Sequence, residues 1–327
     1  MPIQVCPVTA QKSWKSAGAL GSVTRTATSV PGSMALKALR AFKTGRGQRS
    51  PRRSSMSCIR PMCAYLGLMT TIPVLRLDGA IMPPGRQGGL NAAGLEPLLS
   101  KAFANKRTKA VALSINCPGG SPVQSSLIAR RIRQLADRHQ TPVLAFVEDV
   151  AASGGYWLAA IADEIYADPS SLLGSIGVIS AGFGFDEAID RLGISRRAHT
   201  AGKNKMRLDP FQPEKAEDVT WLKTIQGQIH EEFRAHIRAC RGSKLKADED
   251  TLMNGEVWLG RQALELGLID GLGTLPEVLK DKFGKKVKLK PLKQRRSLFS
   301  RFPFMGASVE GALASVEERA LFSRYGL

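Results

Sequence analysis

The sequence predicts an α/β protein, because strand-like and helix-like segments alternate along the middle of the chain. Short apolar runs typical of buried strands occupy 72–77, 109–116 and 142–148. The segments between them, 91–105 and 123–138, have the apolar periodicity of amphipathic helices. Strands and helices of these lengths form parallel βαβ units, and three such units in succession make one α/β core.

Further elements are expected after the third strand. They are a helix rich in small residues (153–162), a short strand (164–167), a glycine-interrupted strand (172–180), a helix (186–192) and a long helix (213–239). A glycine-punctuated segment, 255–273, ends the pattern. We see no internal repeat beyond the alternation. The chain therefore divides into a leader, 1–70, a core domain, 71–284, and a basic, partly helical tail, 285–327.

The formal net charge is +19, but it is unevenly distributed. Residues 1–77 contain twelve basic residues and no acidic one, and Asp78 is the first acidic residue. The rest of the chain carries a formal net charge of +7. A basic patch on a folded domain is typical of nucleic-acid binding, whereas a basic leader and a basic tail around a near-balanced core are not. We therefore expect no nucleic-acid partner.

The leader, 1–70, has no sustained periodicity and is interrupted by proline and glycine, which predicts disorder. Its Ser, Arg and Ala content without acidic residues is also that of a transit peptide. We favour disorder, or a true start at Met69. No run reaches the ~18 to 20 apolar residues that span a bilayer, because 63–74 is short and contains Pro73. We expect a cytoplasmic or peripherally membrane-associated protein.

The cysteine pattern argues against disulfides and metals. The cysteines are odd in number and form no CxxC pair: Cys6, Cys58, Cys63, Cys117 and Cys240. A disulfide framework or a zinc site needs paired or clustered cysteines. We expect a reducing compartment and no cofactor.

Two glycine-rich loops follow the second and third predicted strands. The loop 116–120 (NCPGG) lets the backbone turn sharply and approach a substrate, so that its N–H groups can face an oxyanion. The loop 151–155 (AASGG) places Ser153 at the start of a helix, with its own N–H and that of Gly154 exposed. Alone, each loop has an ordinary interpretation as a βα turn or a helix cap. Together they can supply a nucleophile and two oxyanion donors.

A serine nucleophile needs a base. Among the histidines only His199 is near the expected site, and it remains an alternative base although its pattern is that of a partly exposed strand residue. The others end a helix or lie on the long helix: His139, His230 and His236. A lysine, with a reference pKa of ~10.4, can act as the base where desolvation lowers its pKa by several units. Spacing alone does not choose between Lys203 and Lys205.

The core resembles the signal peptide peptidase A family in five motifs that follow the family's order and spacing: NCPGGSP, VAASGGYWLAAIADEI, LLGSIGVI, GKNKMRLDPF and GEVWLGRQALELGLIDGLG. The resemblance covers 72–283. It implies a Clp protease/crotonase-like α/β fold of repeated ββα units with additional C-terminal helices. It also implies a Ser–Lys dyad, and the core domain, 71–284, would then be the peptidase domain.

The resemblance assigns roles by motif. It implies that Ser153 is the nucleophile and that Gly120 and Gly154 supply the oxyanion N–H groups. The lysine five residues before the motif's proline would be the base, which selects Lys205 over Lys203. Ser175, in GSIGV, matches the serine that orients the base.

Two departures from the family bear on these expectations. Cys117 replaces the more usual Ser or Asp of the family's loop, and we interpret it as a packed small residue. The membrane anchor of many members is missing from the sequence. The chain has a single peptidase unit, like members that resemble ring assemblies in which a neighbouring subunit supplies the lysine. We therefore expect a homo-oligomeric ring with shared sites and an inactive monomer.

The function that follows is a serine endopeptidase that hydrolyses unstructured hydrophobic peptides, such as signal-peptide remnants. A crotonase-type acyl-CoA enzyme is the first alternative, since it shares the fold and the oxyanion hole. The second is a non-catalytic assembly protein, which the presence of Ser153, Ser175 and Lys205 disfavours.

The basic tail has two interpretations. Eight lysines and arginines lie between 285 and 301, interleaved with leucine and phenylalanine farther along. A charge run is usually a solvated segment, and we favour that interpretation. Basic and apolar residues in alternation also suit an anionic membrane surface, so a peripheral membrane contact is the alternative.

Overall fold

The computed structural model describes residues 70–84, 89–292, 316 and 319–327. The chain divides into two compact units, Met1–Met62 and Cys63–Leu327. All described residues lie in the second unit. The predicted leader, apart from Thr70, and most of the predicted tail lie outside them.

One mixed sheet organises the described residues. Its strands follow the order β6-β5-β3-β2-β1-β8, and β4 lies beside β3 with β7 beyond it. All neighbours are parallel except β5 and β6, which are antiparallel. The strands are β1 (Thr71–Asp78), β2 (Val111–Cys117), β3 (Val143–Ala152), β4 (Glu164–Ala167), β5 (Leu172–Gly174), β6 (Val257–Leu259), β7 (Gly271–Leu272) and β8 (Lys288–Leu292).

Strand β3 is longer than the segment 142–148 that the sequence predicts, because it pairs with two strands in turn on the same side. Residues 144–147 pair with β4, and residues 150–152 pair with β5. On its other side β3 pairs with β2, where Cys117 lies opposite Ala151. The C-terminal ends of β2, β3 and β5 therefore meet at one edge of the sheet.

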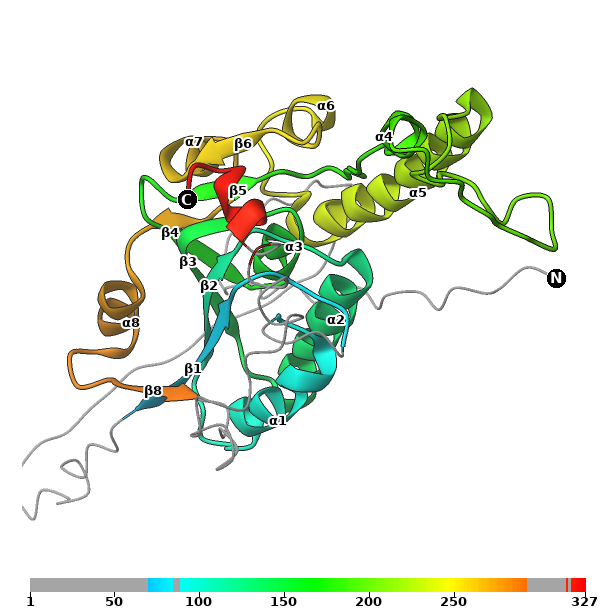
Figure 1. Cartoon of the computed structure of the whole chain (residues 1–327). Helices are drawn as coiled ribbons and strands as arrows, with labels where there is room; N and C mark the ends of the chain where they lie inside the picture. Colours follow the sequence, from blue (N-terminus) through cyan, green and yellow to red (C-terminus); the bar gives the residue numbers. More distant parts are fainter. Residues whose placement is uncertain (1–69, 85–88, 293–315, 317–318) are drawn as a thin grey trace, which may run out of the picture. The chain divides into compact units, whose positions relative to one another are not determined.

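Helices follow the strands as expected for βαβ units (Figure 1). Helix α1 begins where the Asn91 side chain accepts a hydrogen bond from Gly94 N–H, and α2 begins where the Ser121 side chain accepts one from Gln124 N–H. Such caps satisfy N–H groups that a helix leaves unpaired in its first turn. The helices are α1 (Ala92–Phe103), α2 (Pro122–His139), α3 (Gly154–Ala160), α4 (Asp186–Arg191), α5 (Ala216–Arg241), α6 (Glu249–Leu252), α7 (Gly260–Glu265) and α8 (Leu275–Phe283).

The central strands bury side chains on both faces of the sheet, as parallel strands usually do. In β2, alternate residues Val111, Leu113 and Ile115 join the larger core cluster, which includes side chains of α1, α2, α3 and α5. Ala112, between them, joins a smaller cluster that contains Leu279 of α8. Because both faces of the sheet are covered, the strands that carry the loops at their ends are held rigidly.

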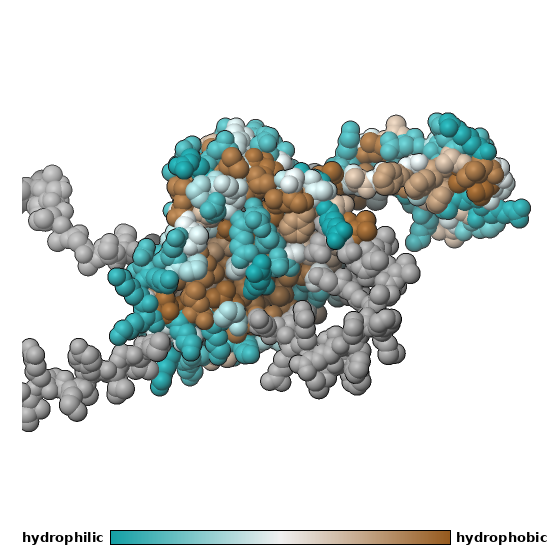
Figure 2. Space-filling model, turned by 60° about the vertical axis from the view of Figure 1, so that its left-hand side comes forward, coloured by the Kyte–Doolittle hydropathy of each residue, from teal (hydrophilic) through white to brown (hydrophobic). Residues whose placement is uncertain are grey.

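A segment from 178 to 222, which we call the extension, leaves the core after β5. It contains α4 and the first turns of α5, and Figure 1 shows these helices beyond α3. Seven of the twelve large apolar residues that are exposed in the described part of the chain lie here: Ile179, Phe183, Phe185, Leu192, Ile194, Leu208 and Trp221. Figure 2 shows brown, apolar patches on this segment at the right of the view. The extension thus presents apolar side chains to the outside.

The C-terminal half of α5 returns to the core. Trp157 of α3 stacks with both Phe233 and His236 of α5, whose ring centroids lie 4.8 and 4.5 Å away. Burial lowers the pKa of His236 to about 4, although its hydrogen bond to the Trp157 carbonyl opposes that shift. Helix α5 therefore connects the extension rigidly to the helix that follows Ser153.

The α/β class and the additional C-terminal helices are confirmed. Strand β8 was not expected: it lies within the segment assigned to the basic tail and pairs with β1 at the sheet edge. Its Lys288 and Lys290 are exposed on either side of the partly buried Leu289, as on an edge strand protected by charge. Within the described ranges, no helix is long and apolar enough to cross a membrane.

Candidate active site

Three of the sequence-predicted residues line one pocket at the meeting strand ends. Gly120 follows β2, Ser153 follows β3 and Ser175 follows β5. The pocket has a volume of about 370 Å³. The carboxyl edge of a parallel sheet is the usual place for a ligand site. The sheet order therefore brings together residues that lie far apart in the sequence.

Ser153 occupies a sharp turn between β3 and α3. Its backbone has φ 52° and ψ −121°, a conformation that a residue with a side chain seldom adopts. It stands at the N-cap position of α3, yet its side chain makes no capping hydrogen bond. Among the described residues its hydroxyl has no hydrogen-bond partner, and its side chain lines the pocket. The turn therefore presents a free hydroxyl instead of a helix cap.

Two backbone N–H groups beside Ser153 are uncommitted. The N–H groups of Gly120 and Gly154 have no hydrogen-bond partner within the described ranges. The sequence also suggested an exposed N–H on Ser153 itself, and that expectation is wrong, because this N–H donates to the Gly174 carbonyl at 2.8 Å. Two donors, at Gly120 and Gly154, remain for a developing oxyanion.

Close packing of the two glycine loops explains why glycine is required at Gly119. Its φ is +108°, and a Cβ there would lie 2.8 Å from the Ser153 Cβ and 2.9 Å from the Gly154 nitrogen. At Gly120, with φ +138°, a Cβ would overlap the Ile81 carbonyl oxygen. The first loop is thus seated directly against the Ser153 turn. Cys117, just before it, is fully buried in the core and is a packed residue, as the sequence suggested.

Ser175 has the second strained serine backbone at the pocket, with φ 50°. The positive φ values of Gly174 and Ser175 end β5 after Gly174, so the strand is shorter than the segment 172–180 expected from the sequence. The Ser175 N–H donates to the Glu256 carbonyl at 2.6 Å, which ties the turn to the strand β6 region. The Ser175 hydroxyl accepts a hydrogen bond from the Tyr325 hydroxyl at 3.3 Å.

His230 supports this turn from α5, a role that sequence reasoning missed. Its Nε2 lies 3.0 Å from the carbonyl oxygen of Ile176, which is the residue after Ser175. The sequence placed His230 correctly on the long helix but gave no signal for a contact with a residue 54 positions earlier. The interaction contributes to fixing the Ser175 turn.

The structure does not bring the candidate bases into this pocket within one chain. Lys205 and Lys203 are exposed and lie in the loop between α4 and α5, in the extension. His199, the alternative base, is exposed in the same loop. None of these residues lines the pocket that contains Ser153.

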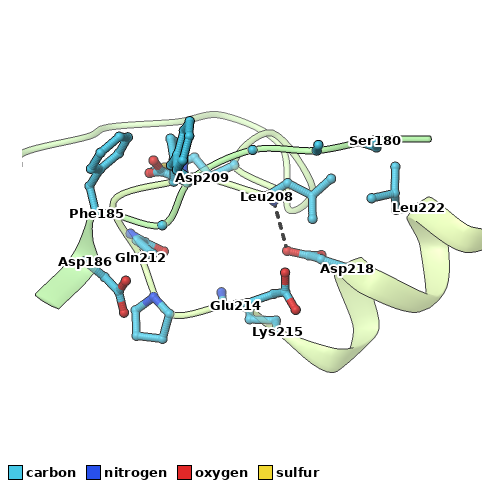
Figure 3. A pocket seen from close by; sticks show the side chains of 17 residues that line it. Ser180, Phe185, Asp186, Leu208, Asp209, Gln212, Glu214, Lys215, Asp218 and Leu222 are labelled. Carbon is cyan, nitrogen blue, oxygen red and sulfur yellow. Dashed lines mark hydrogen bonds between the residues drawn. The ribbon is translucent and has the colours of Figure 1, made fainter. Parts of the chain in front are cut away.

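The loop that carries Lys205 borders a second pocket of about 530 Å³ in the extension. Met206, the residue after Lys205, lines it. Figure 3 shows Leu208 and Asp218 next to each other in its lining, joined by a dashed line where the Leu208 N–H donates to the Asp218 carboxylate at 3.3 Å. Arg207 also pairs with Asp218, at 3.2 Å. These bonds fasten the residues after Lys205 to the start of α5.

The described residues offer no metal centre, because no group of three or more His, Cys, Asp or Glu side chains is placed to hold an ion. The chemistry that the pocket can perform rests on a hydroxyl and two N–H donors. Such a set can attack a carbonyl and stabilise the resulting oxyanion.

Comparisons with known proteins point to peptidases. Residues 136–290 match the model of peptidase family S49. The chain is 32% identical to the chloroplastic serine protease SPPA of Arabidopsis thaliana over 210 residues, covering 63% of this chain and 30% of that protein. It is 32% identical to protease 4 of Haemophilus influenzae over 216 residues, covering 64% of this chain and 34% of that protein.

A higher identity, 51% over 279 residues, relates the chain to a Brucella abortus protein named Na(+)/H(+) antiporter NhaA, covering 80% of this chain but 38% of that protein. The chain spans about a third of the length of these three relatives. Among solved structures, a membrane-bound stomatin-specific protease in complex with a substrate peptide has 16% identity and a TM-score of 0.47, covering 76% of this chain and 99% of that chain.

Proposed function

This chain belongs to the signal peptide peptidase A family, peptidase family S49, and on that premise we propose that it is a serine endopeptidase with Ser153 as the nucleophile. The observation that carries the proposal is the Ser153 turn. A strained backbone holds in a pocket a hydroxyl that has no hydrogen-bond partner among the described residues, next to two N–H groups that likewise have none there. A helix cap or an ordinary loop needs neither the strain nor the second glycine loop.

In the proposed reaction the Ser153 hydroxyl attacks the scissile carbonyl carbon, and its proton passes to a neutral lysine amine, that of Lys205. The N–H groups of Gly120 and Gly154 donate to the oxyanion. The lysine then protonates the leaving amine, and a water that it deprotonates hydrolyses the acyl-enzyme. Ser175 holds the amine in place through its hydroxyl. Each proton that the lysine takes is returned, so the enzyme is regenerated.

We propose that Lys205 acts across a subunit boundary in a homo-oligomeric ring. In one chain Lys205 is exposed and outside the Ser153 pocket, on the segment that also presents most of the exposed apolar residues. Exposed apolar patches commonly mark protein–protein contacts. Packing of the extension against a second copy would bury these residues and remove water from the lysine. Desolvation favours the neutral amine that a base requires.

The substrates we propose are unstructured, hydrophobic peptides, such as signal-peptide remnants. The residues around Ser153 support an apolar preference, since Pro118, Pro122, Val178 and Ile179 line the pocket.

The basic tail remains a candidate for a peripheral contact with an anionic membrane. Lys288 and Lys290 project from the edge strand β8 and are exposed. This contact is an addition to the peptidase function and does not affect the chemistry at Ser153. We propose no nucleic-acid partner.

Single substitutions test the dyad. We expect Ser153→Ala and Lys205→Ala to abolish hydrolysis of an unfolded, casein-like protein, whereas Lys203→Ala, an exposed lysine two residues away, leaves it intact. A fluorophosphonate probe should label Ser153 in the wild-type protein. Full activity of Lys205→Ala, or loss of activity in Lys203→Ala alone, would overturn the assignment of the base. Labelling at Ser153 also separates the peptidase from an acyl-CoA enzyme, which uses no nucleophilic serine.

A further inference from the structure

Residues 319–327 at the end of the chain lie in the candidate active site. Leu321, Arg324 and Tyr325 line the same pocket as Ser153 and Ser175. Figure 1 shows this segment, in red, beside β5 and near α3. Leu321 and Tyr325 are partly buried there, whereas Arg319 and Ala320 are exposed. The segment therefore contacts the pocket through the side that carries Leu321 and Tyr325, and its other side faces solvent.

The contact with Ser175 has a chemical consequence. The Tyr325 hydroxyl donates to the Ser175 hydroxyl oxygen at 3.3 Å. In the proposed function, Ser175 offers that oxygen to the base. A tyrosine in this place and a lysine amine compete for the same hydroxyl.

The backbone of the segment is folded on itself, which argues against a substrate-like role. Leu327 N–H and Tyr325 N–H donate to the Phe322 carbonyl at 3.3 and 2.9 Å, and Gly326 N–H donates to the Ser323 carbonyl at 3.1 Å. A peptide in a protease cleft is extended, and its N–H and C=O groups pair with the enzyme. These groups pair within the segment instead, so it fills the cleft without offering an extended scissile bond.

We propose that residues 319–327 are an intramolecular plug of the active site, which excludes both the peptide substrate and the incoming base while it is seated. The proposal rests on the proposed function for its effect on activity, but the seating itself does not. Release of the plug would free the pocket and the Ser175 hydroxyl together. Substrate binding at Ser153 and placement of the lysine amine at Ser175 would thus both depend on release of the same segment.

A binding experiment tests the seating without any catalysis. A fluorescently labelled peptide with the sequence of residues 319–327 is titrated into two proteins that both carry Ser153→Ala, one of full length and one ending at residue 318. A tethered segment competes at an effective concentration on the order of millimolar. We therefore expect the peptide to bind the shortened protein at least about tenfold more tightly than the full-length one.

Two peptide variants identify the contact. Tyr325→Phe keeps the ring but removes the donor to Ser175, so we expect weaker binding. Ser323→Ala alters an exposed residue whose hydroxyl, among the described residues, donates within the segment to the Ala320 carbonyl at 3.0 Å, and it serves as the matched control. Equal affinity of the peptide for both proteins, or no binding to either, would overturn the plug.

Activity then separates the two proposals. In the chain with its native Ser153, we expect removal of residues 319–327 to raise the rate of peptide hydrolysis, and Tyr325→Phe to raise it less. If the peptide binds as expected but neither protein hydrolyses peptides, the plug stands and the peptidase proposal fails. If both proteins hydrolyse peptides equally and the labelled peptide does not bind, the peptidase stands and the plug fails.

Discussion

The strand-end pocket and the extension differ in how much of their structure one chain supplies. In the pocket, backbone contacts between neighbouring strand ends fix Gly120, Ser153 and Ser175, and the core beneath them is fully buried. In the extension, large side chains such as Phe183, 81% exposed, face outward, and its candidate base is exposed as well. This difference fits the proposal that folding of one chain organises the proposed nucleophile, Ser153, whereas the proposed base, Lys205, reaches the site only from a second copy.

The largest effect is expected from charge on the extension. The double substitution Phe183→Asp with Leu192→Asp should prevent assembly and abolish peptide hydrolysis, because a charged side chain cannot be buried unpaired in an interface. Stability of the single chain should change by less than about 0.5 kcal/mol, since both residues are exposed. Sedimentation and activity measurements check both statements.

Val123→Asp is the matched control for that prediction. Val123 is also a large exposed apolar residue, at 65%, but it lies on α2 and outside the extension. We expect it to leave assembly and activity unchanged. A fully active monomer of the double variant would show that one chain completes its own site.

A smaller loss is expected when the rigid pocket is disturbed. Gly120→Ala introduces a Cβ that overlaps the Ile81 carbonyl oxygen, so the loop and its N–H group must move. Loss of one oxyanion donor reduces kcat by about 10²–10³-fold. Gly227→Ala, on α5 outside the extension, where a Cβ meets nothing within 4 Å, is the control. Steady-state kinetics should show the loss in kcat more than in KM, and wild-type kcat in Gly120→Ala would remove Gly120 from the site.

The pH dependence of stability probes the helix that joins the two regions. Burial lowers the pKa of His236 to about 4, from 6.5 in the unfolded chain. Between these values the unfolded chain binds the proton and the native protein does not, so stability falls as pH drops from 6.5 toward 4. The linked loss is roughly 2–3 kcal/mol. Urea unfolding of His236→Phe should lack this part of the pH dependence, whereas His199→Gln, at an exposed position, should retain it.

The smallest effect is expected at His230, which acts on the pocket through the Ser175 turn. His230→Ala removes the contact with the Ile176 carbonyl, and a hydrogen bond of this kind is worth about 1 kcal/mol. We expect kcat to fall by about fivefold to tenfold, which corresponds to that energy. His230→Gln can restore the donor and should recover part of the rate. If the glutamine variant is no better than the alanine variant, the ring acts only by packing.

The sequence predicted the parts of the fold that depend on local periodicity. The apolar run of the buried strand β2 and the apolar face of α2 are visible in the residues, so both elements were predicted to within two residues of their observed bounds. Strand β8 was missed because its sequence, KLKPL, looks like part of the basic run around it. Only its pairing with β1, far away in the sequence, identifies it as a strand. The early end of β5 was missed because it depends on positive φ at Gly174 and Ser175, which periodicity does not encode.

For the candidate site, the residues alone indicated a nucleophile at Ser153 and two glycine loops, since both follow predicted parallel strands. Ser175 and the choice of Lys205 came from family resemblance. The unused Ser153 hydroxyl, the His230 contact and the seating of Tyr325 could not be predicted, because each depends on residues far apart in the chain. Tertiary contacts therefore supply what spacing cannot.

The most direct test of a shared site is to mix two inactive proteins. Chains with Ser153→Ala keep the lysine, and chains with Lys205→Ala keep the nucleophile. If the base comes from a neighbouring copy, mixed assemblies contain some complete sites, and hydrolysis of an unfolded peptide should reappear on mixing and subunit exchange. If exchange is verified by mass and the mixture stays as inactive as either variant alone, the lysine does not act across the boundary.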